Sequence, residues 1–179
     1  EDNEIGIITI DTFSATIPDQ VRDAINGFSD KVTSVIIDLR DNTGGYLSSA
    51  YNTADLFIEK GKVVYQLKDK NNNISKYEAK TGILRRFDKI VVLINENSAS
   101  ASEILAIALK ESANAIIVGE TSYGKGTVQE TEQLSSGSMV KYTSSYWLSP
   151  NGNSINKLGI KPDVEVKDSN KQLDKAKET

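Results

Sequence analysis

The composition of this 179-residue chain fits one folded domain, since 38% of its residues are hydrophobic and 26% are charged. The net charge of -4 argues against nucleic acid as a partner, because phosphate binding requires a basic face. The chain has no histidine and no cysteine, which excludes disulfides, a Ser-His-Asp triad and a cysteine nucleophile, and leaves zinc without its usual ligands.

In chain order, short β-branched runs alternate with amphipathic segments, a pattern typical of an α/β domain with a parallel sheet. Strands are predicted at residues 5–10, 32–39, 90–94 and 115–118. Helices are predicted after the start signals at residues 14–19, and over residues 47–58 and 100–112. A β-rich part is predicted from a hairpin at 63–67 and 74–79 and an antiparallel strand at 139–148.

The domain organisation predicted from the sequence is simple. No internal repeat is present and no linker divides the chain, so we expect one domain over residues 1–167. Residues 168–179 are polar and are expected to form a tail that is either a loose helix or without order.

A glycine pair and a serine-rich turn follow two of the predicted strands. Gly44 and Gly45 allow the backbone to approach a ligand closely and to present N–H groups to an anion. The serine turn, residues 97–103, lies where a strand gives way to a helix, whose free N–H groups favour an oxyanion. The spacing of Ser100 and Glu103 also fits a capping box, and one serine can serve both roles.

A third turn places Lys125 between two glycines. Together with Gly119 it fits the G-x-x-x-x-G-K pattern of a phosphate-binding loop, but Gly126 stands where such a loop needs Ser or Thr. Residues 127–129 do not begin a long helix, so the NTPase interpretation is disfavoured. Because histidine is absent, lysine is the remaining amine that can act as a base, provided that burial favours its neutral form.

These segments, in this order, resemble the C-terminal processing peptidases, also called tail-specific serine proteases. The segments that carry the resemblance are residues 38–45, 97–104, 119–129, 146–152 and 159–163. The resemblance implies that Ser100 is the nucleophile, that Lys125 is its base and that Gln129 assists the lysine. It also implies an oxyanion hole built from the N–H of Ala101 and an N–H of Gly44 or Gly45.

The same resemblance implies a crotonase/Clp-protease-like α/β core, with a mixed but mostly parallel sheet, flanking helices and a β-rich C-terminal segment. The implied activity is that of a serine endopeptidase that cleaves near the exposed C-termini of protein or peptide substrates, with no metal and no other cofactor. We expect a PDZ domain in the full-length protein. The protein itself can form homo-oligomers. We also expect an extracytoplasmic location (periplasmic, cell-surface or secreted) with a membrane tether.

Two other interpretations stay open from the sequence. A crotonase-like acyl-CoA enzyme would use the glycine turn as an oxyanion hole without needing Ser100 or Lys125. A catalytically inactive peptide-binding or scaffold core would keep the fold without turnover.

Overall fold

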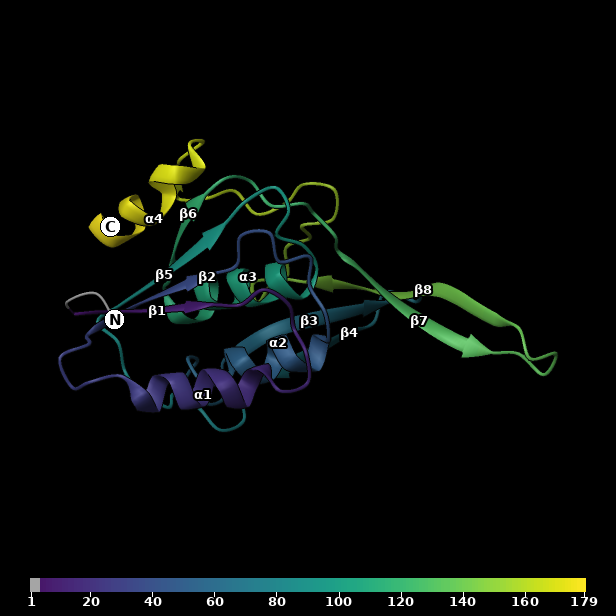
Figure 1. Cartoon of the computed structure of the whole chain (residues 1–179). Coiled ribbons are helices and arrows are strands. Elements are labelled where there is room, and N and C mark those ends of the chain that lie inside the picture. Colours follow the sequence, from purple (N-terminus) through teal and green to yellow (C-terminus); the bar gives the residue numbers. More distant parts are fainter. Residues whose placement is uncertain (1–3) are drawn as a thin grey trace.

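The centre of the molecule is a five-stranded parallel sheet in the order β1-β2-β5-β6-β9 (Figure 1). It is seen in a computed structural model that describes residues 4–179, so the first three residues of the predicted domain 1–167 lie outside the described part. The strands are β1 (Ile5–Thr9), β2 (Ser34–Asp38), β5 (Lys89–Ile94), β6 (Ile116–Gly119) and β9 (Val164–Glu165). The predicted α/β fold class is confirmed, but β9 was not predicted.

Both faces of this sheet are covered by helices. Helices α1 (Ile17–Gly27), α2 (Leu47–Ala54) and α3 (Ala101–Ala113) pack on one face, with Ile37 and Val92 in that core. Helix α4 (Ser169–Glu178) packs on the other face, against Ile36 and Val91. Because successive side chains of a strand point to opposite faces, the continuous apolar runs of β2 and β5 supply both cores.

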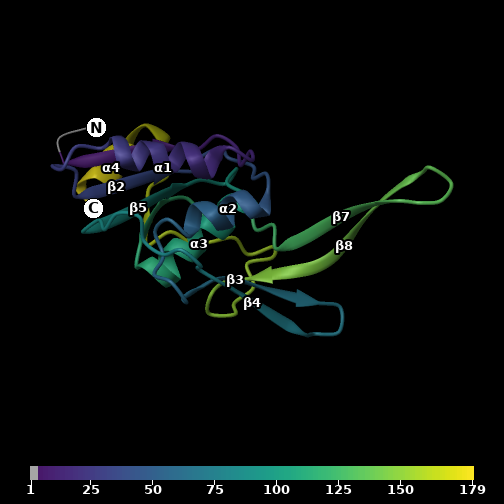
Figure 2. The ribbon, with the colours of Figure 1, turned by 90° about the horizontal axis from the view of Figure 1, so that it is seen from below.

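A second sheet is antiparallel, in the order β4-β3-β8-β7. Its strands are β3 (Val63–Asp69), β4 (Ile74–Glu78), β7 (Thr127–Gln133) and β8 (Met139–Leu148). The predicted hairpin and the strand at 139–148 are present, whereas β7 was not predicted because its polar sequence hides its pairing. The β7–β8 hairpin projects far from the rest of the molecule (Figure 2), and most of its side chains are exposed.

Helix α3 lies between the two sheets and contacts β5, β6 and β3. Ten of its thirteen residues are buried, which explains a sequence that is apolar on almost every side. Helix α2 is shorter than the predicted 47–58 because the carboxylate of Asp55 accepts hydrogen bonds from the backbone of Lys80 and Thr81. The apolar residues that follow, 56–58, are buried in a turn and not in a continuing helix.

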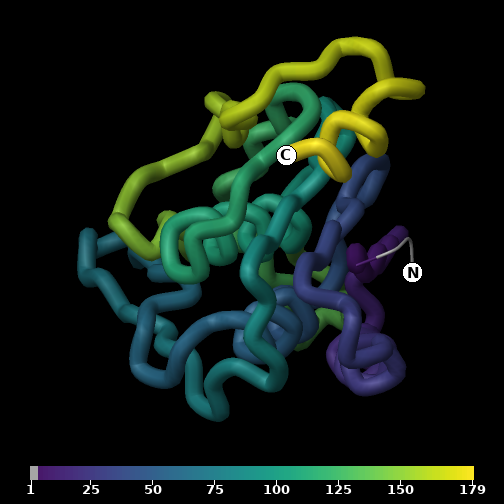
Figure 3. The backbone as a smooth tube through the Cα atoms, turned by 90° about the vertical axis from the view of Figure 1, so that its left-hand side faces the viewer, coloured from purple at the N-terminus to yellow at the C-terminus, as the bar shows by residue number. Residues whose placement is uncertain are grey.

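The polar segment 168–179 is an ordered helix and not the loose tail that was expected. Asp168 caps α4 by accepting a hydrogen bond from the backbone N–H of Asn170 at 3.1 Å. Gln172 and Ala176 are buried under the helix, which lies on the side of the strands away from α1 (Figure 3). The sequence hid this docking because Leu173 and Ala176 are the only apolar residues of α4 and give a weak apolar signal among its polar residues. Among the described residues, no helix has both the length and the apolar character needed to cross a bilayer.

The docking of α4 predicts that Ala176→Asp destabilises the protein. Ala176 is 3% exposed, and an aspartate there would bury an unpaired carboxylate, which costs about 3 kcal/mol of the free energy of unfolding. Urea denaturation followed by circular dichroism measures this loss. The matched control is Lys171→Ala on the exposed side of α4, which removes only an exposed ion pair worth less than about 1 kcal/mol. Equal midpoints for the two variants would contradict the docked helix.

Candidate active site

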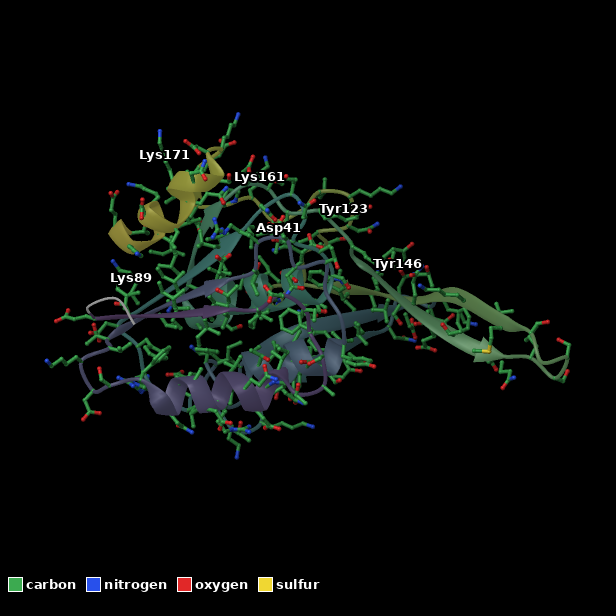
Figure 4. All side chains as sticks on the ribbon, viewed as in Figure 1. Asp41, Lys89, Tyr123, Tyr146, Lys161 and Lys171 are labelled. Carbon is green, nitrogen blue, oxygen red and sulfur yellow. The ribbon has the colours of Figure 1, made fainter. Side chains whose placement is uncertain are left out.

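The three sequence turns meet at one edge of the parallel sheet. Strands β2, β5 and β6 run in the same direction, so the segments that follow them, residues 39–45, 95–100 and 120–126, emerge side by side. Figure 4 shows Asp41 and Tyr123 close to this edge, with Lys89, the first residue of β5, toward the opposite end. The fold thus places together residues that are up to about eighty positions apart in the sequence.

A cleft of about 320 Å³ opens at this edge. Four of the predicted site residues line it: Gly45, Ser100, Lys125 and Gln129. The other two, Gly44 and Ala101, are buried directly behind it, since a methyl group on Gly44 would lie 3.0 Å from Ser100 Cβ and 3.2 Å from Ala101 N. The structure therefore brings all six predicted residues into one place.

Ser100 is the serine of the turn that faces the cleft. Ser98 and Ser102 are fully buried, and their hydroxyls donate to the backbone oxygens of Leu39 and Asn42 at 2.8 and 2.7 Å. Ser100 precedes the first turn of α3 with φ 58° and ψ -114°, a conformation that side-chain-bearing residues rarely adopt. Such local strain is typical of functional positions and costs about 1–3 kcal/mol.

Glu103 connects the serine turn to the lysine turn. Its carboxylate is fully buried and accepts four hydrogen bonds of 2.6–2.9 Å. Oε2 accepts from the backbone N–H groups of Ser100 and Lys125, and Oε1 accepts from the Ser122 hydroxyl and the Gly124 N–H. The capping box is present, but three of the four donors come from the lysine turn and not from the helix.

The backbone of Lys125 is fixed on both sides. Its N–H donates to Glu103, and its carbonyl accepts a hydrogen bond of 2.8 Å from the indole nitrogen of Trp147, which is 1% exposed. The flanking glycines are explained by contact with residues 155–159: a methyl group would lie 2.8 Å from Gly159 N at Gly124, and 2.6 Å from Asn156 Cβ at Gly126. The loop enters strand β7 and no helix begins there, which agrees with rejecting a phosphate-binding loop.

The glycine turn offers one free N–H to the cleft. The N–H of Gly44 donates to Asn42 Oδ1 at 2.8 Å, and Gly44 is buried. Gly45 is exposed and forms a parallel bridge with Phe13, in which Gly44 O and Tyr46 N make the two hydrogen bonds. The N–H of Gly45 itself has no hydrogen-bond partner within residues 4–179 and points away from Phe13.

Asp41 holds the glycine turn against the serine turn at the surface. Its carboxylate accepts hydrogen bonds of 2.9 and 2.8 Å from the amides of Asn95 and Asn97, and its N–H donates to Asn95 Oδ1. The hydrogen bonds from Asn97 and Asn95 lower the pKa of the Asp41 carboxyl below its ordinary value. The tie between the two turns is therefore present above that ordinary value and weakens as the pH falls through the lowered one.

Three residues of the site were not identified from the sequence alone. Glu103 was identified only as a helix cap, and no local pattern indicates its bonds to residues 122–125. Trp147 gave a signal as the only tryptophan of the chain, but its contact with Lys125 depends on strand pairing. Lys141 of β8 also lines the cleft. Two lysines, Lys125 and Lys141, therefore line it, and no acidic residue does.

The chain belongs to peptidase family S41, since the model of that family matches residues 4–166. The family resemblance inferred from the three turns and the segments 146–152 and 159–163 is thereby confirmed. The match covers nearly all of the described residues up to the start of α4.

Similar proteins include processing proteases from bacteria. The chain is 44% identical over 168 residues to the carboxy-terminal processing protease CtpA of Bacillus subtilis (strain 168), an alignment that covers 93% of this chain and 36% of that protein. It is 38% identical over 166 residues to a probable CtpA-like serine protease of Staphylococcus aureus (strain COL), covering 91% and 33%. The chain thus spans about a third of the length of these relatives.

Solved structures give the same assignment of fold. The photosystem II D1 C-terminal processing protease superposes with a TM-score of 0.85 at 33% identity, over 91% of this chain and 42% of that one. A lipoprotein from Streptococcus agalactiae superposes with a TM-score of 0.80 at 21% identity, over 99% of this chain and 67% of that one, and this likeness concerns the fold alone.

The role of Glu103 predicts that Glu103→Ala destabilises the protein by about 3–5 kcal/mol, because the substitution leaves buried donors without an acceptor. Chemical denaturation measures the change. Glu103→Gln is expected to lose less, since its amide oxygen still accepts two of these hydrogen bonds. The control is Glu96→Ala, an exposed glutamate close in sequence, with an expected change within about 0.5 kcal/mol. If Glu103→Ala behaves like Glu96→Ala, the carboxylate does not hold the two turns together.

Proposed function

We propose that this chain is the catalytic core of a serine endopeptidase that uses a Ser-Lys dyad and cleaves substrates near their C-termini. The observation that carries the proposal is that Ser100 and Lys125 line the same cleft, with Ser100 strained before a helix and Lys125 fixed by Glu103 and Trp147. The names of the similar proteins support it. The acyl-CoA and scaffold interpretations gain no support from any of these observations.

In the proposed first step, Ser100 Oγ attacks the scissile carbonyl carbon while the Lys125 amine takes the hydroxyl proton. The tetrahedral intermediate then collapses, the C–N bond breaks, and Lys125 gives its proton to the leaving amine. Water, deprotonated by Lys125, attacks the acyl-enzyme, and the proton returns to Ser100 as the acid product leaves.

Lys125 must be neutral to accept the proton of Ser100. Its amine forms no ion pair with any residue in the described part of the chain. Gln129 lines the same cleft two residues into β7. Its amide can orient the amine without adding a negative charge, whereas a carboxylate at this position would favour the ammonium.

The oxyanion is held, in this proposal, by the N–H groups of Ala101 and Gly45. Ala101 is the first residue of α3, so its N–H has no acceptor within the helix and lies at the positive end of the helix dipole. Gly45 is favoured over Gly44 because the N–H of Gly44 is already bonded to Asn42 Oδ1, while that of Gly45 is free on the cleft side.

Other properties of the whole protein remain proposals, because the chain spans only about a third of its relatives' length. We expect the full-length protein to carry a PDZ domain that binds substrate C-termini by strand addition. We also expect it to work outside the cytoplasm with a membrane tether.

The dyad predicts that Ser100→Ala and Lys125→Ala each reduce cleavage at least about 10³-fold, because each removes a group that bonds to the reacting atoms. The measurement is hydrolysis of an internally quenched unstructured peptide with an apolar C-terminus. Lys125→Arg is expected to be inactive as well, since a guanidinium keeps its proton. Ser138→Ala and Lys161→Ala, both at exposed positions outside the cleft, are the controls and should keep the parent rate. Normal turnover by Ser100→Ala would remove the nucleophile assignment.

The oxyanion hole predicts a loss of about 10²–10³ in kcat for Gly45→Ala. A methyl group at Gly45, where φ is +141°, would lie 2.4 Å from Phe13 O, so the turn must move and carry its N–H away. Gly137→Ala is the matched control, because Gly137 also has positive φ (+85°) but no atom within 4 Å of the added methyl group. Thermal unfolding of both variants separates a displaced donor from an unfolded protein. An unchanged kcat in Gly45→Ala would exclude Gly45 as a donor.

A further inference from the structure

Helix α4 runs along the outer face of the parallel sheet and begins at the edge where the candidate site lies. Its first residues follow β9, which pairs with the end of β6, and the N–H of Val166 donates to Gly119 O at 2.9 Å. At the other end of the sheet, the Lys89 ammonium donates to Thr179 O. Figure 4 shows this direction, with Lys171 near the start of α4 and Lys89 near its end. The first turn of α4 is therefore the part of the helix closest to the three turns of the site.

Gln172, the fourth residue of this helix, is a wholly buried polar side chain. Its exposed fraction is 0%, whereas the residues of α4 that pack in the adjoining core are apolar. A side chain that only fills space there is expected to be apolar as well, because burying an amide is unfavourable unless its hydrogen bonds are restored. They are restored here. Nε2 donates to Val166 O at 2.8 Å and to Glu120 Oε2 at 3.4 Å, and Oε1 accepts from Arg40 Nη1 at 3.3 Å.

Arg40 carries the contact from α4 to the glycine turn. Its Nε and Nη2 donate to the two carboxylate oxygens of Asp38 at 2.9 and 2.6 Å, and this bidentate pair fixes the plane of the guanidinium. The two side chains are only 21% and 10% exposed, so solvent weakens the pair little. The remaining nitrogen, Nη1, points to α4, where it donates to Ser169 O at 3.2 Å as well as to Gln172. The first turn of α4 thus supplies both acceptors of that nitrogen.

Arg40 stands directly before the part of the glycine turn that forms the site. Asp41 has a positive φ of 60° and is bound to the serine turn, whereas Asn42 is wholly buried and accepts the N–H of Gly44. The turn is therefore held by the serine turn at Asp41, by the interior at Asn42 and by α4 at Arg40. Without the contact at Arg40 the start of the turn can shift, and the N–H of Gly45, five residues on, shifts with it.

The amide nitrogen of Gln172 reaches the start of the lysine turn. Glu120 is the first residue after β6, and its N–H donates to Ile94 O at 3.1 Å. The hydrogen bond from Gln172 Nε2 to the Glu120 carboxylate is long, at 3.4 Å, and therefore weak. The guanidinium of Arg40 is held by four acceptor contacts, including the bidentate pair, so we expect the larger effect of Gln172 on the glycine turn.

We propose that Gln172 is a positioning residue of the active site. Its oxygen holds Arg40, and through Arg40 it holds the glycine turn that carries the N–H of Gly45. Its nitrogen holds the start of the lysine turn at Glu120. This assignment rests on the proposed peptidase function. It makes the docked state of α4 a condition of full activity, although α4 lies beyond residues 4–166, which the family model matches.

The first test is the kinetics of Gln172→Met, which keeps the length of the side chain and removes both of its hydrogen-bonding groups. We expect kcat to fall about tenfold, because a displaced oxyanion donor binds the transition state less well. KM should stay within about twofold of the parent value, since contacts with the bound substrate in the cleft are unchanged. Gln172→Glu keeps an oxygen for Arg40, so it should recover kcat to within about threefold of the parent. Its unfolding midpoint should nevertheless fall, because it loses the donor to Val166 O.

Leu173→Ala is the matched control for stability. Leu173 is the next residue of α4 and packs against the same sheet face, but its side chain has no group that can bond to Arg40. Its truncation should lower the urea midpoint at least as much as Gln172→Met does, through lost apolar contacts, and should leave kcat unchanged. Equal losses of kcat in the two variants would show that α4 contributes stability alone, and would refute the positioning role of Gln172.

Action through Arg40 predicts that the effects of two substitutions do not add. Arg40→Lys keeps a positive charge beside Asp38, but an ammonium lacks the planar fork that bonds to Asp38 and to α4 at the same time. We expect Arg40→Lys and Gln172→Met each to lower kcat, and the double variant to be no slower than the slower single variant. A double variant whose loss of kcat is the product of the two single losses would overturn the proposed path through Arg40.

Amide hydrogen exchange separates this proposal from the peptidase proposal, because it requires no turnover. In Gln172→Met, peptic fragments that cover residues 38–46 should exchange faster than in the parent, whereas Leu173→Ala should change only the fragments of α4. Unchanged exchange at 38–46 in Gln172→Met would overturn the assignment and leave the proposed hydrolysis intact. A parent protein that does not cleave, but in which Gln172→Met speeds exchange at 38–46, would refute the peptidase proposal and support the contact between α4 and the glycine turn.

Discussion

The buried carboxylate of Glu103 joins the two sides of the cleft that Ser100 and Lys125 line. The serine side is built on β5 and α3, and the lysine side is a loop that leads from β6 to a different sheet. Glu103 belongs to the first side and accepts hydrogen bonds from Ser122, Gly124 and Lys125 of the second. Because buried backbone N–H groups must find acceptors, the loop has one arrangement in which these donors are satisfied at once. That arrangement places Lys125 in the same cleft as Ser100.

Parallel topology supplies the rest of the site. The turns after β2 and β5 emerge at the same edge, and Ser98, Ser102 and Asp41 bind them to each other through backbone and amide groups. The turns approach so closely that side chains are excluded, as at Gly44, whose added methyl group would lie 2.9 Å from Ala99 O. The free N–H groups of Ala101 and Gly45 therefore belong to turns whose positions are fixed by buried contacts, which is the preorganisation that oxyanion binding requires.

The sequence was sufficient for features that depend on local pattern. The apolar runs of β2, β5 and β6 identified a parallel sheet, and the three turns predicted a group of site residues, four of which line one cleft in the structure. Features that depend on distant partners were not predictable. Strand β7 is recognised only by its pairing with β8, α4 only by the sheet face that Ala176 covers, and the tie of Glu103 only by the position of residues 122–125.

The two sides of the cleft differ in how firmly the fold supports them. Ser100 and the glycine turn are backed by the main core, whereas Lys125 and Gln129 lead into a hairpin whose outer residues are exposed on both strands. Local opening is easiest where few apolar contacts resist it, so the hairpin side is the part of the site that can move with least cost. Glu103 and Trp147 hold the backbone of Lys125 where that hairpin begins, so the position of Lys125 is independent of movement in the strands beyond it. Gln129 and Lys141 lie beyond this anchor, so a bound peptide that contacts them can adjust the entrance of the cleft while Ser100 and Lys125 keep their relative position.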